Sequence, residues 1–126
     1  MDAEERRKLV QTWIAHHKKL AETRKIDDET FWSYEKLDDL CQNSPRLAWE
    51  IILEILETDQ SDAVIANLAA GPLEDLLAEH GPEFINQVEE YARRNPKFRH
   101  LLGGVWQNAM SNEIWARVQA AAGERW

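Results

Sequence analysis

The sequence predicts an all-α fold, either a compact orthogonal bundle or an α-solenoid-like stack of seven to eight short helices. Apolar residues recur at helical spacing almost throughout, and no run alternates β-branched with polar residues as a strand does. Each of the four prolines follows a Ser, Gly or Asn, where one helix can end and proline can start the next. The chain has 126 residues, enough for one hydrophobic core, so we expect residues 1–126 to form a single domain.

Four helices are predicted in the first half of the chain. They cover residues 3–23, 29–42, 45–57 and 61–69. Ser44 and Ser61 are expected to cap the third and fourth, because a serine hydroxyl accepts hydrogen bonds from the free amides of a first turn. The third helix, RLAWEIILEILE, is apolar except for one strip of charged residues. This pattern predicts a central helix with neighbours on two or three sides.

The remaining prolines divide the second half into short helices. Gly71-Pro72 and Gly81-Pro82 are expected to bracket a helix over residues 72–79, with the next helix starting at Pro82. Neither glycine belongs to a phosphate-binding loop, which needs GxxxxGK[ST] or GxGxxG after a strand. We therefore interpret both glycines as separators between helices.

The C-terminal part is predicted to hold two more helices. One starts at Asn95-Pro96, and the last is capped by Ser111 and ended by Gly123. Between them, Gly103-Gly104 weakens a helix by roughly 1 kcal/mol per glycine relative to alanine. We expect this pair to allow close helix packing, a kink or a turn.

Charge is unevenly distributed along the chain, whose net charge is −8. Residues 1–26 carry seven basic and four acidic side chains, residues 27–90 carry two and seventeen, and residues 91–126 carry six and two. Phosphate contacts need a basic surface, so we expect no nucleic-acid binding as the main role. The acidic middle fits a basic protein partner, although seventeen carboxylates are also typical of solvated helix faces.

Four segments carry a family resemblance: AWEIILEIL, LAAGPLEDLLAEHGPEFI, FRHLLGGVW and IWARV. They resemble a family of small bacterial proteins of unknown function, over roughly residues 30 to 120. The resemblance implies a bacterial, cytoplasmic, all-helical domain, and it brings no established catalytic residue. A single cysteine and a charged start without an apolar h-region also favour the cytoplasm, with no membrane association expected.

Two pairs of carboxylates suggest an enzyme as an alternative function of the chain. Glu35 and Asp38 lie three residues apart on the second helix, and Glu50 and Glu54 lie four apart on the third. Mg²⁺ prefers such oxygen ligands, and the layout resembles that of magnesium-dependent, all-helical nucleotide pyrophosphohydrolases. The two glutamates fall on the polar strip of their helix, however, which is typical of a solvated face. We therefore predict no metal site and no cofactor.

Asp38 differs from these glutamates because it falls on the apolar arc of its helix. A buried carboxylate needs a partner, and Arg46, Lys36, a tryptophan N–H or a helix N-terminus are the candidates. Histidine and cysteine form no recognisable set for zinc or thiol chemistry: His17 is expected in the core, and Cys41 has no CxxC companion.

We predict a non-enzymatic module that binds another protein, a basic one, and name no catalytic residue. By analogy alone, small acidic bacterial proteins of this kind act as immunity proteins or antitoxins. The alternatives are the magnesium enzyme and a structural domain that forms homo-oligomers. Trp32 is included as an interface anchor beside acidic residues, although packing between helices also explains a tryptophan there. The predicted partner-binding residues are Trp32, Glu35, Asp38, Asp39, Glu74, Asp75 and Glu79.

Overall fold

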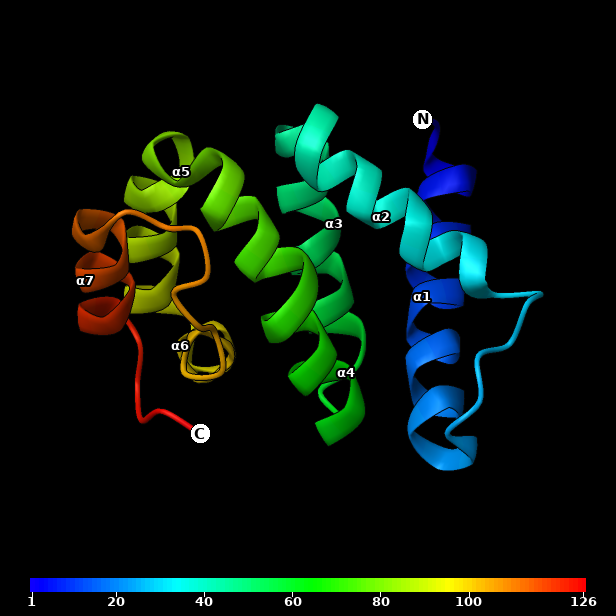
Figure 1. The fold of residues 1–126 in the computed structure, drawn as a ribbon. Helices are drawn as coiled ribbons and strands as arrows, with labels where there is room; N and C mark the ends of the chain where they lie inside the picture. The colour runs from blue at the N-terminus through cyan, green and yellow to red at the C-terminus, as the bar shows by residue number, and fades with distance from the viewer.

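The computed structural model describes residues 1–126 and confirms an all-α fold (Figure 1). Its α-helices are α1 (Ala3–Thr23), α2 (Phe31–Asn43), α3 (Pro45–Thr58), α4 (Asp62–Leu68), α5 (Glu74–Arg94), α6 (Pro96–Leu102) and α7 (Asn112–Ala121). A π-helical turn, η1 (Ala69–Leu73), joins α4 to α5. Because α4, η1 and α5 run on without a break, the chain forms six continuous helices, slightly fewer than the seven to eight predicted.

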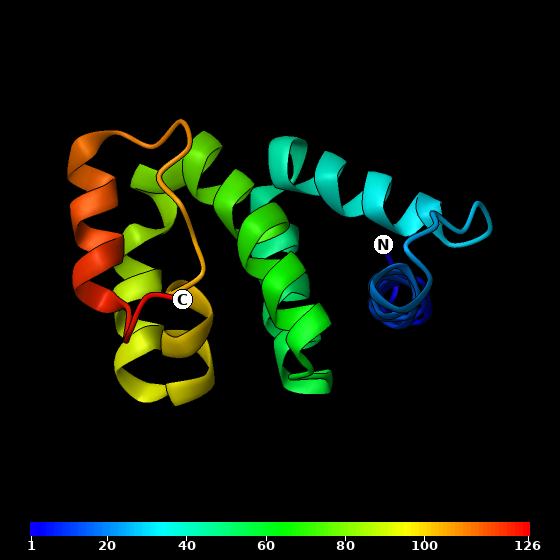
Figure 2. The same ribbon diagram turned by 60° about the horizontal axis from the view of Figure 1, so that its bottom comes forward.

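The helices pack across one another rather than as a regular stack. In Figure 2, α1 is seen end-on while α2 runs across the view, so these two neighbours cross steeply. At the other end of the molecule, α5 packs against α6 and α7 (Figures 1 and 2). Of the two predicted architectures, the arrangement matches the orthogonal bundle.

The central position predicted for the third helix is confirmed. Helix α3 contacts α1, α2, α4, η1 and α5. Six of its residues are buried: Ala48, Trp49, Ile51, Ile52, Ile55 and Leu56. They belong to a core cluster of 31 buried hydrophobic residues to which all the helices contribute. Burial of apolar surface on several sides of α3 is therefore what holds the bundle together.

One of the three predicted serine caps forms, at Ser111, and Asn95 provides a further cap that was not predicted. The side chain of Asn95 accepts from the Phe98 amide at 3.1 Å, and the Ser111 hydroxyl accepts from the Ile114 amide at 3.2 Å. Ser44 and Ser61 make no side-chain cap, so those two predictions are wrong. The Ser61 amide instead donates to the carboxylate of Asp59 at 2.8 Å, which fixes the backbone before α4.

The predicted helix break at Gly71-Pro72 is also wrong, because the chain stays helical there. Proline has no N–H to donate one turn back, and its ring crowds the carbonyl four residues earlier. The wider π turn of η1 accommodates Pro72 in the interior of the helix. The predicted separation at Gly81-Pro82 survives as a kink, since His80 has non-helical angles of φ −132° and ψ 24° within α5.

Gly103 and Gly104 form a turn after α6 against which the last residues of the chain pack. A Cβ at Gly104 would overlap the indole ring of Trp126, and one at Gly103 would overlap the backbone oxygen of Glu124. The Trp126 amide donates to the Gly103 carbonyl at 3.1 Å, and its indole N–H donates to the His100 carbonyl at 2.7 Å. Of the three roles predicted for Gly103-Gly104, the structure therefore shows a turn with close packing, and no kink.

None of the helices combines the length and the apolar character that crossing a lipid bilayer requires.

Candidate functional site

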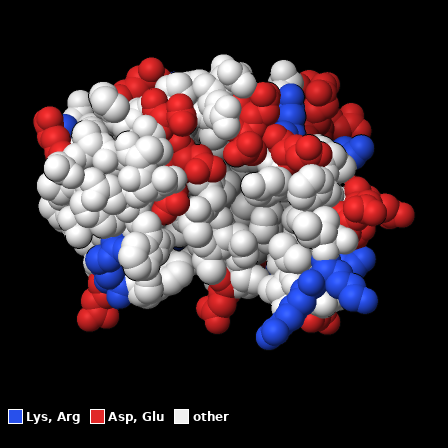
Figure 3. Space-filling model, viewed as in Figure 1, with Lys and Arg blue, Asp and Glu red and all other residues white.

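The predicted acidic residues come from two helices that contact each other, α2 and α5. Glu35, Asp38 and Asp39 lie on α2, and Glu74, Asp75 and Glu79 lie in the first two turns of α5. Acidic side chains gather across the upper part of the face shown in Figure 3, over these two helices. The helix packing thus combines what the sequence presents as two separate acidic groups.

A small pocket lies between α2 and the turn that leads into α5. Its volume is about 40 Å³. It is lined by Trp13, Tyr34, Asp38, Gly71, Pro72 and Asp75. We call it the Asp38–Asp75 pocket, because these carboxylates are its two charged groups.

Asp38 and Asp75 are both half-buried, and neither forms an ion pair. Burial, and after it the charges of Asp38, Glu74 and Glu79, together raise the pKa of Asp75 to about 6. Desolvation and like charge both disfavour the ionised carboxylate. The pocket therefore stores unfavourable electrostatic energy, which a cation placed in it would relieve.

The partner predicted for Asp38 is not found. Arg46 donates to the Gln87 side-chain oxygen at 3.2 Å, and its guanidinium lies 5.6 Å from the ring centroid of Phe84. Lys36 lines a different hollow of the surface. Arg46 and Lys36, two of the four kinds of partner predicted for Asp38, are therefore wrong predictions, because both side chains extend toward other neighbours.

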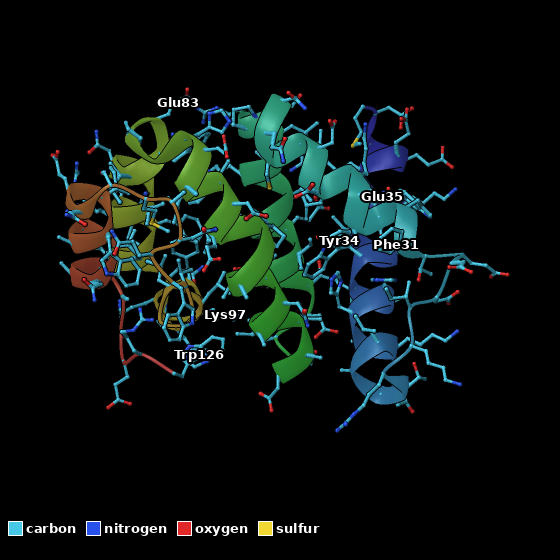
Figure 4. The ribbon with its side chains drawn as sticks, in the orientation of Figure 1. Phe31, Tyr34, Glu35, Glu83, Lys97 and Trp126 are labelled. Atoms are coloured by element: carbon cyan, nitrogen blue, oxygen red, sulfur yellow. The ribbon has the colours of Figure 1, made fainter.

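Aromatic side chains form the walls of the pocket. Trp13 is 1% exposed, and its indole Nε1–H is buried without a hydrogen-bond acceptor. Tyr34 is 44% exposed and stacks on Phe31, with ring centroids 5.5 Å apart. In Figure 4 both Phe31 and Tyr34 lie along the lower side of α2, toward α1, and Glu35 lies above them. The pocket thus combines two acceptor carboxylates with walls formed in part by Trp13 and Tyr34.

Behind the pocket, buried side chains fix its walls. The His17 ring packs at a tilt against the Trp13 indole, with ring centroids 3.9 Å apart, and its Nδ1 lies 2.9 Å from the Trp13 carbonyl oxygen. Burial lowers the pKa of His17, so the ring is neutral near pH 7. The Cys41 thiol donates to the Pro72 carbonyl at 3.4 Å, which ties α2 to the π turn.

Trp32 lies apart from this pocket. It lines another hollow, of about 430 Å³, with Met1, Glu5, Lys8, Leu9 and Lys36. The ammonium nitrogen of Lys8 lies 5.7 Å from the Trp32 ring centroid. The exposed tryptophan is thus surrounded mainly by basic and apolar side chains, and it does not extend the Asp38–Asp75 pocket.

The other predicted residues divide into bonded and free carboxylates. Glu74 accepts from the Trp106 amide at 2.9 Å, which anchors the loop after α6. Asp39 accepts from the Asn43 side chain at 2.8 Å. Glu35 and Glu79 are exposed and have no partner within the chain. Glu35 and Glu79 are therefore the carboxylates that remain free around the pocket.

The four carboxylates of the magnesium alternative do not converge. Arg6 binds both Glu50 and Glu54, at 3.1 and 2.8 Å. No group of three or more His, Cys, Asp or Glu side chains is placed to hold a metal ion. Glu50 and Glu54 thus form ion pairs with Arg6 of α1. Asp38 instead lines the pocket with Asp75.

Sequence reasoning missed the contribution of Trp13, Tyr34 and Pro72 to the site. A signal for the π turn is present, however. Buried residues recur at strict four-residue intervals, Leu68-Pro72-Leu76 and Ala69-Leu73-Leu77. An α-helix of 3.6 residues per turn drifts away from such spacing, whereas a wider turn keeps these residues on one face.

Comparison with known proteins gives one match. No curated protein and no solved structure matches the chain. Residues 20–125 match a family of unknown function (DUF6869). The matched region contains every residue of the Asp38–Asp75 pocket except Trp13, which α1 contributes from before it.

Proposed function

The chain belongs to this family of unknown function, and we propose that it is a non-enzymatic module that binds a basic protein partner through its acidic surface. One observation carries the proposal: Asp38 and Asp75 share a half-buried pocket without any cation of the chain to balance them. The folded chain keeps the repulsion between these two carboxylates, although this repulsion lowers its stability. A site that holds unfavourable charge at the expense of stability is typical of a binding surface.

The surroundings of the pocket fit the same role. The free carboxylates of Glu35 and Glu79 extend the negative surface around the half-buried pair. Complementary charge at a rim accelerates association, whereas a desolvated pair at the centre contributes to affinity. The first form of the proposal to test is an immunity- or antitoxin-like protein that blocks a basic partner. The product of the neighbouring gene is the candidate partner to identify and test.

The test starts from affinity capture with the purified chain at low salt, followed by titration calorimetry with the purified partner. We expect Asp38→Asn/Asp75→Asn to weaken binding by at least about 30-fold, because the pair is partly desolvated. Exposed reversals, Glu35→Lys/Asp39→Lys, should weaken binding mainly at low salt, since rim charges are screened.

The matched control is Glu22→Lys/Asp28→Lys, which makes the same charge change at exposed carboxylates without ion pairs, away from the pocket. This control should retain the wild-type affinity within about threefold at physiological salt. The proposal is wrong if the wild-type chain binds no partner, or if the control loses as much affinity as the pocket variants.

A further inference from the structure

Residues 123–126 lie on the surface beside α6, outside the hydrophobic core. They are exposed, follow the end of α7, and belong neither to the core cluster nor to the side chains packed against it. In Figure 4, Trp126 lies below α6 at the edge of the molecule. We call these four residues the tail, and the part of α6, the turn after it and α7 that they contact the tail-binding surface. Since the core is complete without the tail, this surface can be considered as a site and the tail as its occupant.

Two tryptophans of the tail-binding surface contact a guanidinium. The guanidinium carbon of Arg125 lies 4.9 Å from the ring centroid of Trp115 and 5.4 Å from that of Trp106. Arg125 forms no ion pair, and its side chain donates one hydrogen bond, to the Val105 carbonyl at 2.9 Å. A planar guanidinium stacks well on aromatic faces, whereas the ammonium of lysine is compact and more strongly hydrated. This part of the surface therefore favours arginine over lysine.

The neighbouring part of the surface is shaped for an indole. The Trp126 ring stacks on the His100 ring, with centroids 5.3 Å apart, and its N–H donates to the His100 carbonyl at 2.7 Å. A Cβ on Gly104 would overlap this indole, and the three atoms nearest to it all belong to Trp126. The φ of Gly104 is not positive, so its backbone conformation is open to other residues. The missing side chain at Gly104 thus makes room for the indole and is not needed for the turn.

The backbone of the tail-binding surface presents acceptors to the tail. The tail donates hydrogen bonds to the carbonyls of Arg99, His100, Gly103 and Val105. Arg99 and His100 belong to the last turn of α6, where carbonyls lack partners within the helix and the helix dipole is negative. A ligand must therefore bring donors and positive charge together with a large ring. An extended segment in which an aromatic residue follows arginine meets all of these requirements.

We infer that the tail-binding surface is a recognition site for an arginine–aromatic segment of the partner, and that the tail is a self-ligand that the partner displaces. The site adjoins the acidic surface, because Glu74 in the first turn of α5 accepts from the Trp106 amide at 2.9 Å. A basic partner on the acidic surface can therefore reach it. The inference rests on the proposed function for the nature of the partner, but a peptide tests the site independently.

The test uses a full-length variant in which the site is emptied, Arg125→Ala/Trp126→Ala. The probe is the peptide acetyl-Gly-Glu-Arg-Trp-amide, which has the sequence of the tail. Unlabelled peptide is titrated into ¹⁵N-labelled chain, and the indole N–H signals of Trp106 and Trp115 are followed by NMR. We expect saturable shifts in the emptied variant and at least about tenfold weaker binding to the wild type, whose tethered tail competes at high effective concentration.

Two altered peptides separate the contributions of the two side chains. Replacement of the peptide arginine by lysine should weaken binding to the emptied variant at least about fivefold, because the ammonium loses the planar contact with the indoles. Replacement of the peptide tryptophan by alanine should weaken it at least about tenfold, because a large aromatic contact is lost. Trp126→Ala alone is a second way to open the site and should bind the original peptide more tightly than the wild type does.

Variants of the surface connect the signal to the site. Gly104→Ala, added to the emptied variant, fits the space that the indole has left and should weaken peptide binding at least about tenfold, because its Cβ occupies the position of the ring. The matched control is Trp32→Ala in the same background. It removes an exposed tryptophan of α2 and should change binding by less than about twofold, since distant sites act independently.

Three outcomes would overturn the inference. Absence of saturable binding to both opened variants would mean that the surface only packs its own tail. Equal binding to wild type and emptied variant would place the peptide elsewhere on the chain. Equal binding of the three peptides would show general attraction of cations to an acidic protein. Capture of a basic partner is judged by its own experiment, so peptide binding without any captured partner would refute the proposed function and leave the site standing.

Discussion

Asp75 carries an electrostatic cost in the folded protein. Its pKa is raised from 3.8 to about 6, first by burial and then by the neighbouring carboxylates, so the folded chain holds this proton more tightly than the unfolded chain. Stability contributed by such a group is greatest at low pH and is lost as the pH rises from about 4 through 6. After allowance for solvent screening of a half-buried group, the loss is on the order of 1–2 kcal/mol.

Replacement of Asp75 by asparagine should therefore stabilise the chain. We expect Asp75→Asn to raise the free energy of unfolding by about 1–2 kcal/mol at pH 7.5 and to change it little at pH 4. Urea denaturation of variant and wild type at both pH values measures the difference in their free energies of unfolding. The titration of other groups affects both proteins equally and cancels in this difference. The control is Glu79→Gln, at an exposed carboxylate on the same helix, which should change the free energy of unfolding little. If Asp75→Asn destabilises the chain at pH 7.5, the ionised Asp75 carboxylate does not lower its stability.

The sequence identifies both acidic residues of the pocket but not their relationship. Asp38 is recognisable because it interrupts the apolar arc of α2, and Asp75 because it lies in an acidic first turn. Their proximity depends on how α2 packs against η1 and α5, which no local pattern encodes. Trp13 looks like any core tryptophan in the sequence, since its missing acceptor is a property of the packed structure.

Among the helical elements, the π turn η1 determines the direction in which the first turn of α5 faces. Pro72 lies in the interior of the continuous helix from Asp62 to Arg94, where a regular α-helix would clash with its ring. The wider turn keeps Leu73 and Leu77 in the core and leaves Asp75 at the pocket. The irregular turn is thus the local feature that places a charged residue beside buried ones.

The two glycines that precede prolines should respond differently to substitution. Outside its chain neighbours and its own helix, nothing lies within 4 Å of a Cβ placed on Gly71, and its φ is not positive, so Gly71→Ala should be tolerated, with the gain of alanine in a helix offset by the crowding of its Cβ against the Pro72 ring. A Cβ on Gly81 would lie 3.0 Å from the Ile114 side chain, so Gly81→Ala should gain nothing or lose stability. Thermal unfolding of the two variants side by side measures the contrast, and equal shifts would refute it.

Helix positions were largely predictable, and helix boundaries less so. The spans of α1 and α3 follow from their apolar arcs, because periodicity extends over several turns. The Ser111 cap forms as the sequence indicates, whereas Ser44 does not cap α3. Its backbone, at φ −142° and ψ 63°, departs from the extended conformation in which the other capping residues hold their side chains.

Across the whole molecule, the basic ends of the chain neutralise one part of the acidic middle. Lys18 pairs with Asp59 at 3.0 Å, and Lys97 pairs with Glu57 at 3.7 Å. With the ion pairs of Arg6, basic side chains thus bind Glu50, Glu54 and Glu57 on the strip of α3 that the sequence presents as solvated, and Lys18 binds just after the end of α3. None of them reaches Asp38 or Asp75, so the charge of these two carboxylates stays unbalanced, beneath the acidic side chains that gather in the upper part of the face in Figure 3.

Unbalanced charge should make stability depend on salt. We expect the melting temperature at pH 7.5 to rise by about 2–4 °C between 20 and 500 mM NaCl, because screening weakens the repulsion within a chain of net charge −8. Asp38→Asn/Asp75→Asn should show a smaller rise. Near pH 5.0, the isoelectric point, the wild-type rise should largely vanish. A melting temperature that falls with salt at pH 7.5 would show that ion pairs outweigh the repulsion.

Cys41 gives this site a built-in chemical reporter. It is the one thiol of the chain, it is buried, and burial together with the charges of Asp75 and Asp38 raises its pKa to about 12. A disulfide reagent cannot react with it until α2 and the π turn separate and break the contact with the Pro72 carbonyl. The labelling rate therefore records how often the pocket region opens, and a ligand that bridges the two helices should slow it without any engineered probe.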